Sequence, residues 1–147
     1  MSGASELAYA VAARFDNLVS DSGGILFGPW TAWNPLSNSW AVKSPYTGAW
    51  VRRAPGNTCQ ISALMTPGTD TDLTTVGTIP SSDSDGNTLR PLTTQDVPLT
   101  VDQLRQSGTP FEGASLRILT DGTVQCFGVA GAATRAAVNA FYCLDSM

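Results

Sequence analysis

Two pairs of aspartates are the residues best suited to acid–base chemistry in this chain. Asp70 and Asp72 lie in "GTDTDL", and Asp83 and Asp85 lie in "SDSDGN". A glycoside hydrolase needs two carboxylates, one as general acid and the other as base or nucleophile. Asp and Asn in polar loops more commonly hydrogen-bond the backbone of their own turn. We therefore interpret both pairs as turn-forming residues, with a small glycan hydrolase as an alternative class of function.

The sequence lacks the residues that other common catalytic and metal-binding sites need. The chain has no histidine, which removes the usual general base near neutral pH and the usual partner of a serine or cysteine nucleophile. The "SDSDGN" loop resembles the start of a calcium loop, but Ser81 and Leu92 occupy the first and last ligand positions. The sequence therefore predicts a protein that is not an enzyme, with no catalytic residue, no cofactor and no metal ion.

All four tryptophans fall in one short stretch, at Trp30, Trp33, Trp40 and Trp50. Aromatic rings either fill a core, where each buries about 150–250 Å², or form an exposed surface on which a sugar ring can stack. Trp30 is expected where an N-terminal segment meets the following domain.

A loop and the strand after it hold the candidate residues of an exposed binding surface. The segment "SPYTGAWVRR" contains Tyr46, Thr47, Trp50 and Arg53. Aromatic faces stack on sugar rings, and an arginine offers several donors to hydroxyl or acidic groups. The alternative is that Tyr46 and Trp50 pack in the core or between subunits.

Composition restricts the possible partners. The 147 residues correspond to one domain with a short appendage, and only 14% of them are charged. The formal net charge of -4 argues against nucleic-acid binding, which needs a basic face. No basic membrane-surface patch, no signal peptide and no apolar run of about 18 residues occurs, so no membrane insertion is expected. The three cysteines lie in apolar runs and are expected to act as small buried hydrophobes.

The N-terminal residues 1–24 are predicted to form a short α-helix that acts as an assembly or docking stalk. A helix over residues 4–20 would place four apolar side chains at heptad spacing. These residues, which would form a self-association interface, are Ala8, Val11, Phe15 and Leu18. The stripe is equally compatible with an amphipathic helix that packs on its own domain.

Residues 25–147 carry the signals of an all-β head domain. In "TCQISALM", apolar and polar residues alternate with the period of a strand. The segment "SLRILTDGTVQCFG" predicts a hairpin, because Asp121-Gly122 favours a two-residue type I′ turn. Pro98 in "DVPLTV" predicts an edge strand. Together with the other Thr-rich and apolar segments, about seven or eight short strands predict an antiparallel β-sandwich or barrel.

The order of landmarks resembles the C-terminal domains of phage tail-fibre and minor tail proteins, particularly of phages that infect actinobacteria. In order, the landmarks are Trp33, "PLSNSW", a Tyr/Pro segment, "WVRR", a Pro-Gly turn, "PGT", "TVGTIP", "LRPL" and "DGTV". They cover the chain from about Phe27 onward. The resemblance implies a jelly-roll-like β-sandwich that forms a homotrimer at the end of a fibre. Trp33 and Trp40 match the framework tryptophans of this family, so we assign them to the core. In such a trimer, the apolar stripe of the N-terminal helix is expected at the interface.

The resemblance also implies a function. The chain is expected to be a virion protein, assembled in the host cytoplasm, whose tail-fibre or tail-tip head attaches to the host cell surface. The candidate receptor-binding residues are then Tyr46, Thr47, Trp50 and Arg53. Its expected partners are further copies of itself, other virion structural proteins and a host cell-surface glycan. The alternative is a capsid decoration or head-fibre protein that docks through its N-terminal helix.

Overall fold

The computed structural model describes residues 27–104 and 113–145, and within these ranges the regular structure is entirely β-strand. The predicted N-terminal helix and its stripe lie outside the described residues: Ala8, Val11, Phe15 and Leu18. The described strands are β1 (Thr31–Ala32), β2 (Ala41–Val42), β3 (Trp50–Ala54), β4 (Thr58–Thr66), β5 (Thr75–Thr78), β6 (Gln95–Val101), β7 (Ala114–Ile118), β8 (Thr123–Phe127) and β9 (Ala136–Cys143).

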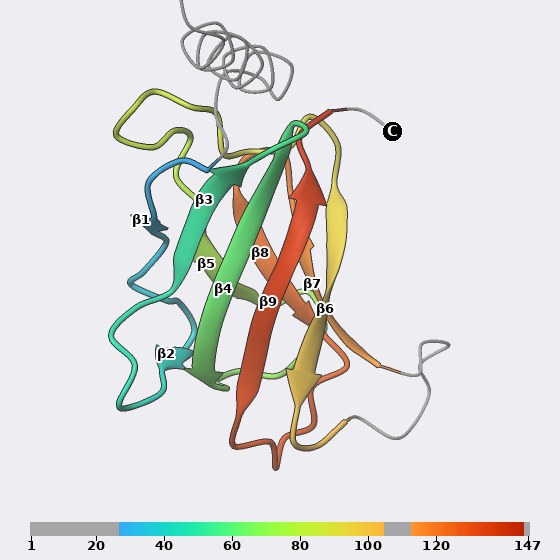
Figure 1. The fold of residues 1–147 in the computed structure, drawn as a ribbon. Helices are drawn as coiled ribbons and strands as arrows, with labels where there is room; N and C mark the ends of the chain where they lie inside the picture. The colour runs from blue at the N-terminus through green and yellow to red at the C-terminus, as the bar shows by residue number, and fades with distance from the viewer. Residues whose placement is uncertain (1–26, 105–112, 146–147) are drawn as a thin grey trace, which may run out of the picture.

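The strands form one antiparallel sheet that curls into a half-barrel (Figure 1). Their order is β1-β3-β4-β9-β6-β7-β8-β5, and β2 pairs with the end of β4. In Figure 1, β3, β4 and β9 form the front layer, and β5, β7 and β8 lie behind them. The prediction of an all-β antiparallel fold is therefore confirmed, and the arrangement is consistent with a β-sandwich.

β6 connects the two layers, and its position corrects the expectation of an edge strand. Gln95–Leu99 pair with β7, whereas Thr100 and Val101 pair with β9. Pro98 has a partner on the β7 side, and the ladder with β9 begins only two residues later. A proline lacks one donor, and a strand that changes partners leaves room for one at the crossover. The prediction was wrong because it assumed that each strand keeps the same two neighbours along its length.

The alternation in β4 sets the two faces of the front layer. Cys59, Ile61, Ala63 and Met65 are buried, while the residues between them are partly exposed. The same alternation places Val138 of β9 in the core. We call the side that carries the buried residues the inner face and the opposite side the outer face.

The hairpin of β7 and β8 is confirmed, but its turn is not type I′. The backbone N–H of Gly122 donates to the carbonyl of Leu119 at 2.9 Å, and the N–H of Leu119 donates to the carbonyl of Thr123 at 2.9 Å. Gly122 has a φ of 90° and Asp121 is not in the positive-φ region. This pattern is a three-residue loop with a glycine bulge, whereas type I′ needs positive φ at both central residues.

Both tryptophans assigned to the core are buried. Trp33 is 1% exposed and donates its indole N–H to the carbonyl of Trp50 at 3.0 Å. Trp40 is 3% exposed and donates to the carbonyl of Thr69 at 2.8 Å. Both indole N–H groups therefore have an acceptor, as buried donors in a stable core usually do.

The cysteines divide into two groups, which corrects the expectation that all three are buried. Cys59 and Cys126 are buried, Cys143 is half-buried, and none of them forms a disulfide in the described structure. Burial raises the pKa of the Cys59 thiol to about 11. Cys143 is the last residue of β9 and its side chain falls on the outer face, which the apolar character of its segment did not reveal.

Candidate functional site

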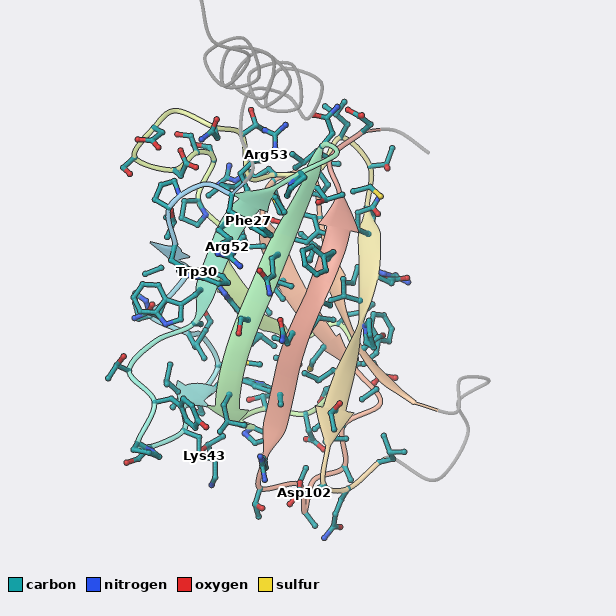
Figure 2. All side chains as sticks on the ribbon, viewed as in Figure 1. Phe27, Trp30, Lys43, Arg52, Arg53 and Asp102 are labelled. Atoms are coloured by element: carbon teal, nitrogen blue, oxygen red, sulfur yellow. The ribbon has the colours of Figure 1, made fainter. Side chains whose placement is uncertain are left out.

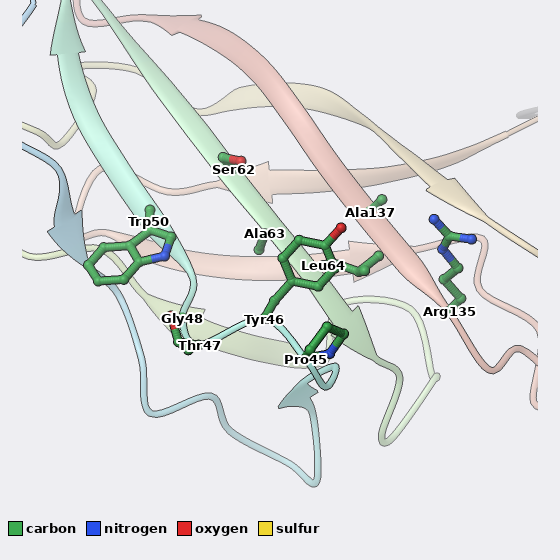
Figure 3. A pocket seen from close by; sticks show the side chains of 10 residues that line it. All are labelled: Pro45, Tyr46, Thr47, Gly48, Trp50, Ser62, Ala63, Leu64, Arg135 and Ala137. Atoms are coloured by element: carbon green, nitrogen blue, oxygen red, sulfur yellow. The ribbon is translucent and has the colours of Figure 1, made fainter.

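A hollow of about 450 Å³ lies on the outer face over β4 (Figure 3). We call it the β4 groove. Its volume is within the range of small-molecule sites. The lining side chains used below are Tyr46, Thr47, Trp50, Ser62, Leu64 and Arg135.

Tyr46 comes from the segment that follows β2. The backbone N–H of Lys43 donates to the carbonyl of Leu64 at 2.9 Å, and the N–H of Tyr46 donates to the carbonyl of Lys43 at 3.0 Å. These bonds hold the segment against β4. The Tyr46 ring then lies in front of β4, between Trp50 and Arg135 (Figure 3), and its side chain is 60% exposed.

Trp50 begins β3 and lies directly opposite Ser62 of β4. Its backbone is fixed to the core through the indole N–H of Trp33, while the residue itself is 38% exposed. Gly48 packs against its ring, since a Cβ atom at position 48 would lie 2.7 Å from Cζ2 of Trp50. The orientation of the Trp50 ring therefore depends on the absence of a side chain at position 48.

Arg135 precedes β9 and supplies the charge of the groove. The Asp102 carboxylate accepts hydrogen bonds from the backbone N–H groups of Thr134, at 2.9 Å, and Arg135, at 3.1 Å. It also accepts one from the Thr134 hydroxyl. These bonds, above all the one from the hydroxyl, lower the pKa of Asp102. Asp102 thus fixes the backbone from which the Arg135 side chain reaches the groove.

A second hollow, of about 330 Å³, is lined by Trp30, Trp50 and Ser62. We call it the edge hollow. Beside it, the Arg52 guanidinium lies 4.2 Å from the centre of the Trp30 ring and 4.1 Å from that of Phe27. Figure 2 shows these three side chains at the β1–β3 edge. The contacts are cation–π interactions, and they hold the guanidinium against two aromatic rings.

A chain of polar contacts continues from Arg52 across the outer face. Its Nε donates to Oε1 of Gln60 at 2.8 Å. Gln60 Nε2 then donates to Oδ1 of Asn139 at 3.0 Å. The side chains of β3, β4 and β9 are therefore held in place beside the two hollows.

The structure brings together three of the four candidate receptor-binding residues. Tyr46, Thr47 and Trp50 line the β4 groove, but Arg53 does not. Arg53 lies toward the other end of β3, where its Nη2 donates to Oδ1 of Asn57 at 2.7 Å. Trp50 lies opposite Ser62 on the outer face, whereas Arg53 lies opposite the buried Cys59. Because side chains alternate between the faces of a strand, Arg53 points away from the groove.

Sequence reasoning missed Arg135. The usable signal was the alternation of β9, in which Arg135 and Ala137 fall on the side of Asn139. That signal becomes useful only when β9 is known to lie beside β4, and the pairing of strands this distant is not written in local sequence. The pairing of Ala137 with Leu64 is what brings Arg135 to the groove.

The aspartates lie away from the groove. Oδ1 of Asp83 accepts the backbone N–H groups of Asp85 and Asn87, each at 2.9 Å, as expected for a turn-forming residue. Asp72 accepts the backbone N–H of Gly128 at 3.0 Å. The 81–88 loop follows β5, whereas Gly128 follows β8, and these strand ends lie at opposite ends of the half-barrel.

Further observations and the comparisons with known proteins add no candidate site. Within residues 27–104 and 113–145, no three His, Cys, Asp or Glu side chains are grouped as metal ligands. The same residues contain no helix of the length and apolarity needed to span a bilayer.

No protein-family model, no curated protein and no solved structure matches the chain.

Proposed function

We propose that the half-barrel is a non-enzymatic binding domain whose β4 groove recognises a carbohydrate on a host cell surface. The observation that carries the proposal is the pair of exposed aromatic rings, Tyr46 and Trp50, that line one groove with the Ser62 hydroxyl and the Arg135 guanidinium. Aromatic rings offer apolar faces to the C–H faces of a sugar, and the polar groups can bond its hydroxyls. Exposed large apolar side chains that gather on one face commonly mark a binding site.

The resemblance of the sequence landmarks supports a virion as the setting. In this proposal the domain is the jelly-roll-like head of a tail-fibre or tail-tip protein. Three copies associate through the helix of residues 1–24, which joins the head to other virion proteins. Several weak sites on one rigid trimer then give tight attachment by avidity.

The groove is tested by removing both rings from the full chain. Tyr46→Ala combined with Trp50→Ala should abolish binding to an array of bacterial cell-wall oligosaccharides, while circular dichroism stays unchanged. Phe141→Ala is the matched control, because Phe141 is 56% exposed on the same sheet but does not line the groove. A double variant that binds like the parent protein would overturn the proposal. Dissociation of a parent oligomer by the double variant would also overturn it, by making the groove a subunit interface.

A single methyl group provides a finer test. Gly48→Ala places a Cβ atom against the Trp50 ring, so it should weaken glycan binding by several fold and change the tryptophan emission. Gly113→Ala adds the same methyl group where no atom lies within 4 Å and should change neither. Equal binding by the two variants would contradict the role of Trp50.

Native mass spectrometry tests the assembly. The full chain should be a trimer, and Phe15→Asp should shift it to monomer by placing a charge in the expected apolar stripe. A parent protein that is monomeric at micromolar concentration would contradict both the stalk and the tail-fibre setting.

A further inference from the structure

The β4 groove and the edge hollow share two residues, Trp50 and Ser62. Trp50 is therefore a common wall, and the two hollows follow each other along the outer face. Trp30 borders one end of this track, and Arg135 borders the other. An inference about what fills the track rests on the proposed function, because it concerns the same surface.

The track is longer than one sugar ring. It begins beside β1, crosses β3 and β4, and ends at the start of β9, so it crosses three strand spacings. Neighbouring strands lie about 4.8 Å apart, which makes the track about 14 Å long. A linked chain of about three sugar rings fits this length, with aromatic rings at Trp30, Trp50 and Tyr46 spaced along it.

Positive charge borders the track at both ends. Arg135 lines the β4 groove, and Arg52 lies over the Trp30 ring at the edge hollow. No aspartate or glutamate is among the described residues that line either hollow. The chain as a whole has a net charge of -4, so a track free of carboxylates departs from the rest of the molecule. Guanidinium groups bind carboxylates and phosphates through charge-assisted hydrogen bonds.

We propose that the track binds the interior of an extended, negatively charged polysaccharide rather than a single terminal sugar. An acidic substituent of the polymer lies at Arg135, and successive rings stack along Tyr46, Trp50 and Trp30. The acidic group is a carboxylate or a phosphate, because a guanidinium accepts either. Arg52 is held by Phe27, Trp30 and Gln60 and attracts the chain at the far end.

The test measures affinity for defined oligosaccharides of one to six rings in neutral, uronic-acid and phosphate-substituted series. The parent should prefer acidic chains of about three rings or more over single rings by at least about tenfold, because one charge-assisted contact has that effect. The series that binds best identifies the acidic group. Neutral chains that bind as tightly as acidic ones, or single rings that bind as tightly as chains, would overturn the inference and leave carbohydrate binding intact.

Two variants separate length from charge. Arg135→Gln should remove the preference for acidic over neutral chains, and Arg117→Gln is the control, since Arg117 pairs with Asp96 at 3.0 Å away from the track. Trp30→Ala should weaken binding of chains but not of single rings. An equal loss for both lengths would overturn the proposed track. A folded parent that binds no member of any series would instead contradict the proposed function itself.

Discussion

The inner and outer faces of the front layer are built from alternate residues of the same strands, yet they carry opposite kinds of side chain. Val51 and Ile61 point inward and are completely buried, while their neighbours Trp50 and Ser62 point outward to the hollows. The inner face needs large apolar groups because they hold the two layers together. Folding makes no such demand on the outer face, so exposed aromatic rings there are free to serve another purpose, which for Tyr46 and Trp50 is the proposed glycan contact.

The four tryptophans show the same difference between buried and exposed side chains within one residue type. Trp33 and Trp40 are buried, and each donates its indole N–H to a backbone carbonyl. Trp30 and Trp50 are 43% and 38% exposed. The first pair stabilises the fold, and the second pair leaves apolar surface exposed, which contacts the glycan in the proposed function.

The largest contrast between the faces should appear on truncation to alanine. Ile61→Ala leaves a cavity in the core and should lower the free energy of unfolding by about 2–5 kcal/mol. Phe141→Ala on the outer face should change it by less than about 0.5 kcal/mol. Urea denaturation of both variants measures the difference, and equal losses would break the distinction between the faces.

Alkaline pH should destabilise the inner face through Cys59. Burial raises the pKa of this thiol to about 11, while in the unfolded chain the value is about 8.5. Between these values the unfolded chain loses the proton and the folded protein retains it. Stability is therefore fully present below about pH 8.5 and falls by about 2–3 kcal/mol as the pH rises to about 11.

The control for this pH effect is a pair of alanine variants studied over the same range. The stability of Cys59→Ala should fall less steeply than that of the parent, and the stability of Phe141→Ala, which changes no titratable group, should follow the parent. Burial also raises the pKa of Tyr142, which adds to the fall at the highest pH in every variant. A Cys59→Ala curve parallel to that of the parent would show that Cys59 does not carry the effect.

A smaller effect should separate the two pairs of tryptophans. Trp40→Phe removes the donor to the carbonyl of Thr69 and leaves a small void, so it should lower stability by about 1–3 kcal/mol. Trp30→Phe, at an exposed position, should have little effect on thermal unfolding. Similar melting temperatures for the two variants would mean that the Trp40 hydrogen bond adds nothing to the core.

The smallest effect concerns the chemical accessibility of thiols. One thiol per chain, that of Cys143, should react with an aromatic disulfide reagent in the native protein, while Cys59 and Cys126 should react only on unfolding. Cys143→Ala should remove the rapid phase. Rapid reaction of two or three thiols would show that the inner face opens readily.

Sequence predicted the inner face better than the outer one, and the reason is physical. The alternation around Ile61 and the β7–β8 hairpin follow from local pattern, because packing leaves few choices for residue type. The burial of Trp33 and Trp40 was predicted from the order of landmarks along the chain. The turn type at Gly122 and the crossover at Pro98 depend on ladder register, which local pattern does not determine.

The candidate site was predictable only in part. Tyr46, Thr47 and Trp50 are close in sequence, so one segment was enough to suggest them. Arg135 reaches the same groove through the pairing of β9 with β4 and through its anchor at Asp102, which is far away in sequence. Arg53 shows the converse. It is close to Trp50 in sequence but lies on the other face of β3, because successive residues of a strand alternate between faces.

The position of β9 has a consequence for how this domain comes into being. β9 is the last strand along the described chain, yet it lies between β4 and β6 and pairs position 58 with position 143. A growing polypeptide therefore presents β4 with one open edge until residues 136–143 have emerged from the ribosome, and an open edge can recruit strands of other chains. Closure joins segments that are far apart in the sequence, and such contacts form more slowly than local ones. The front layer is thus completed only once β9 is available to pair with β4, and both the core and the groove depend on that pairing.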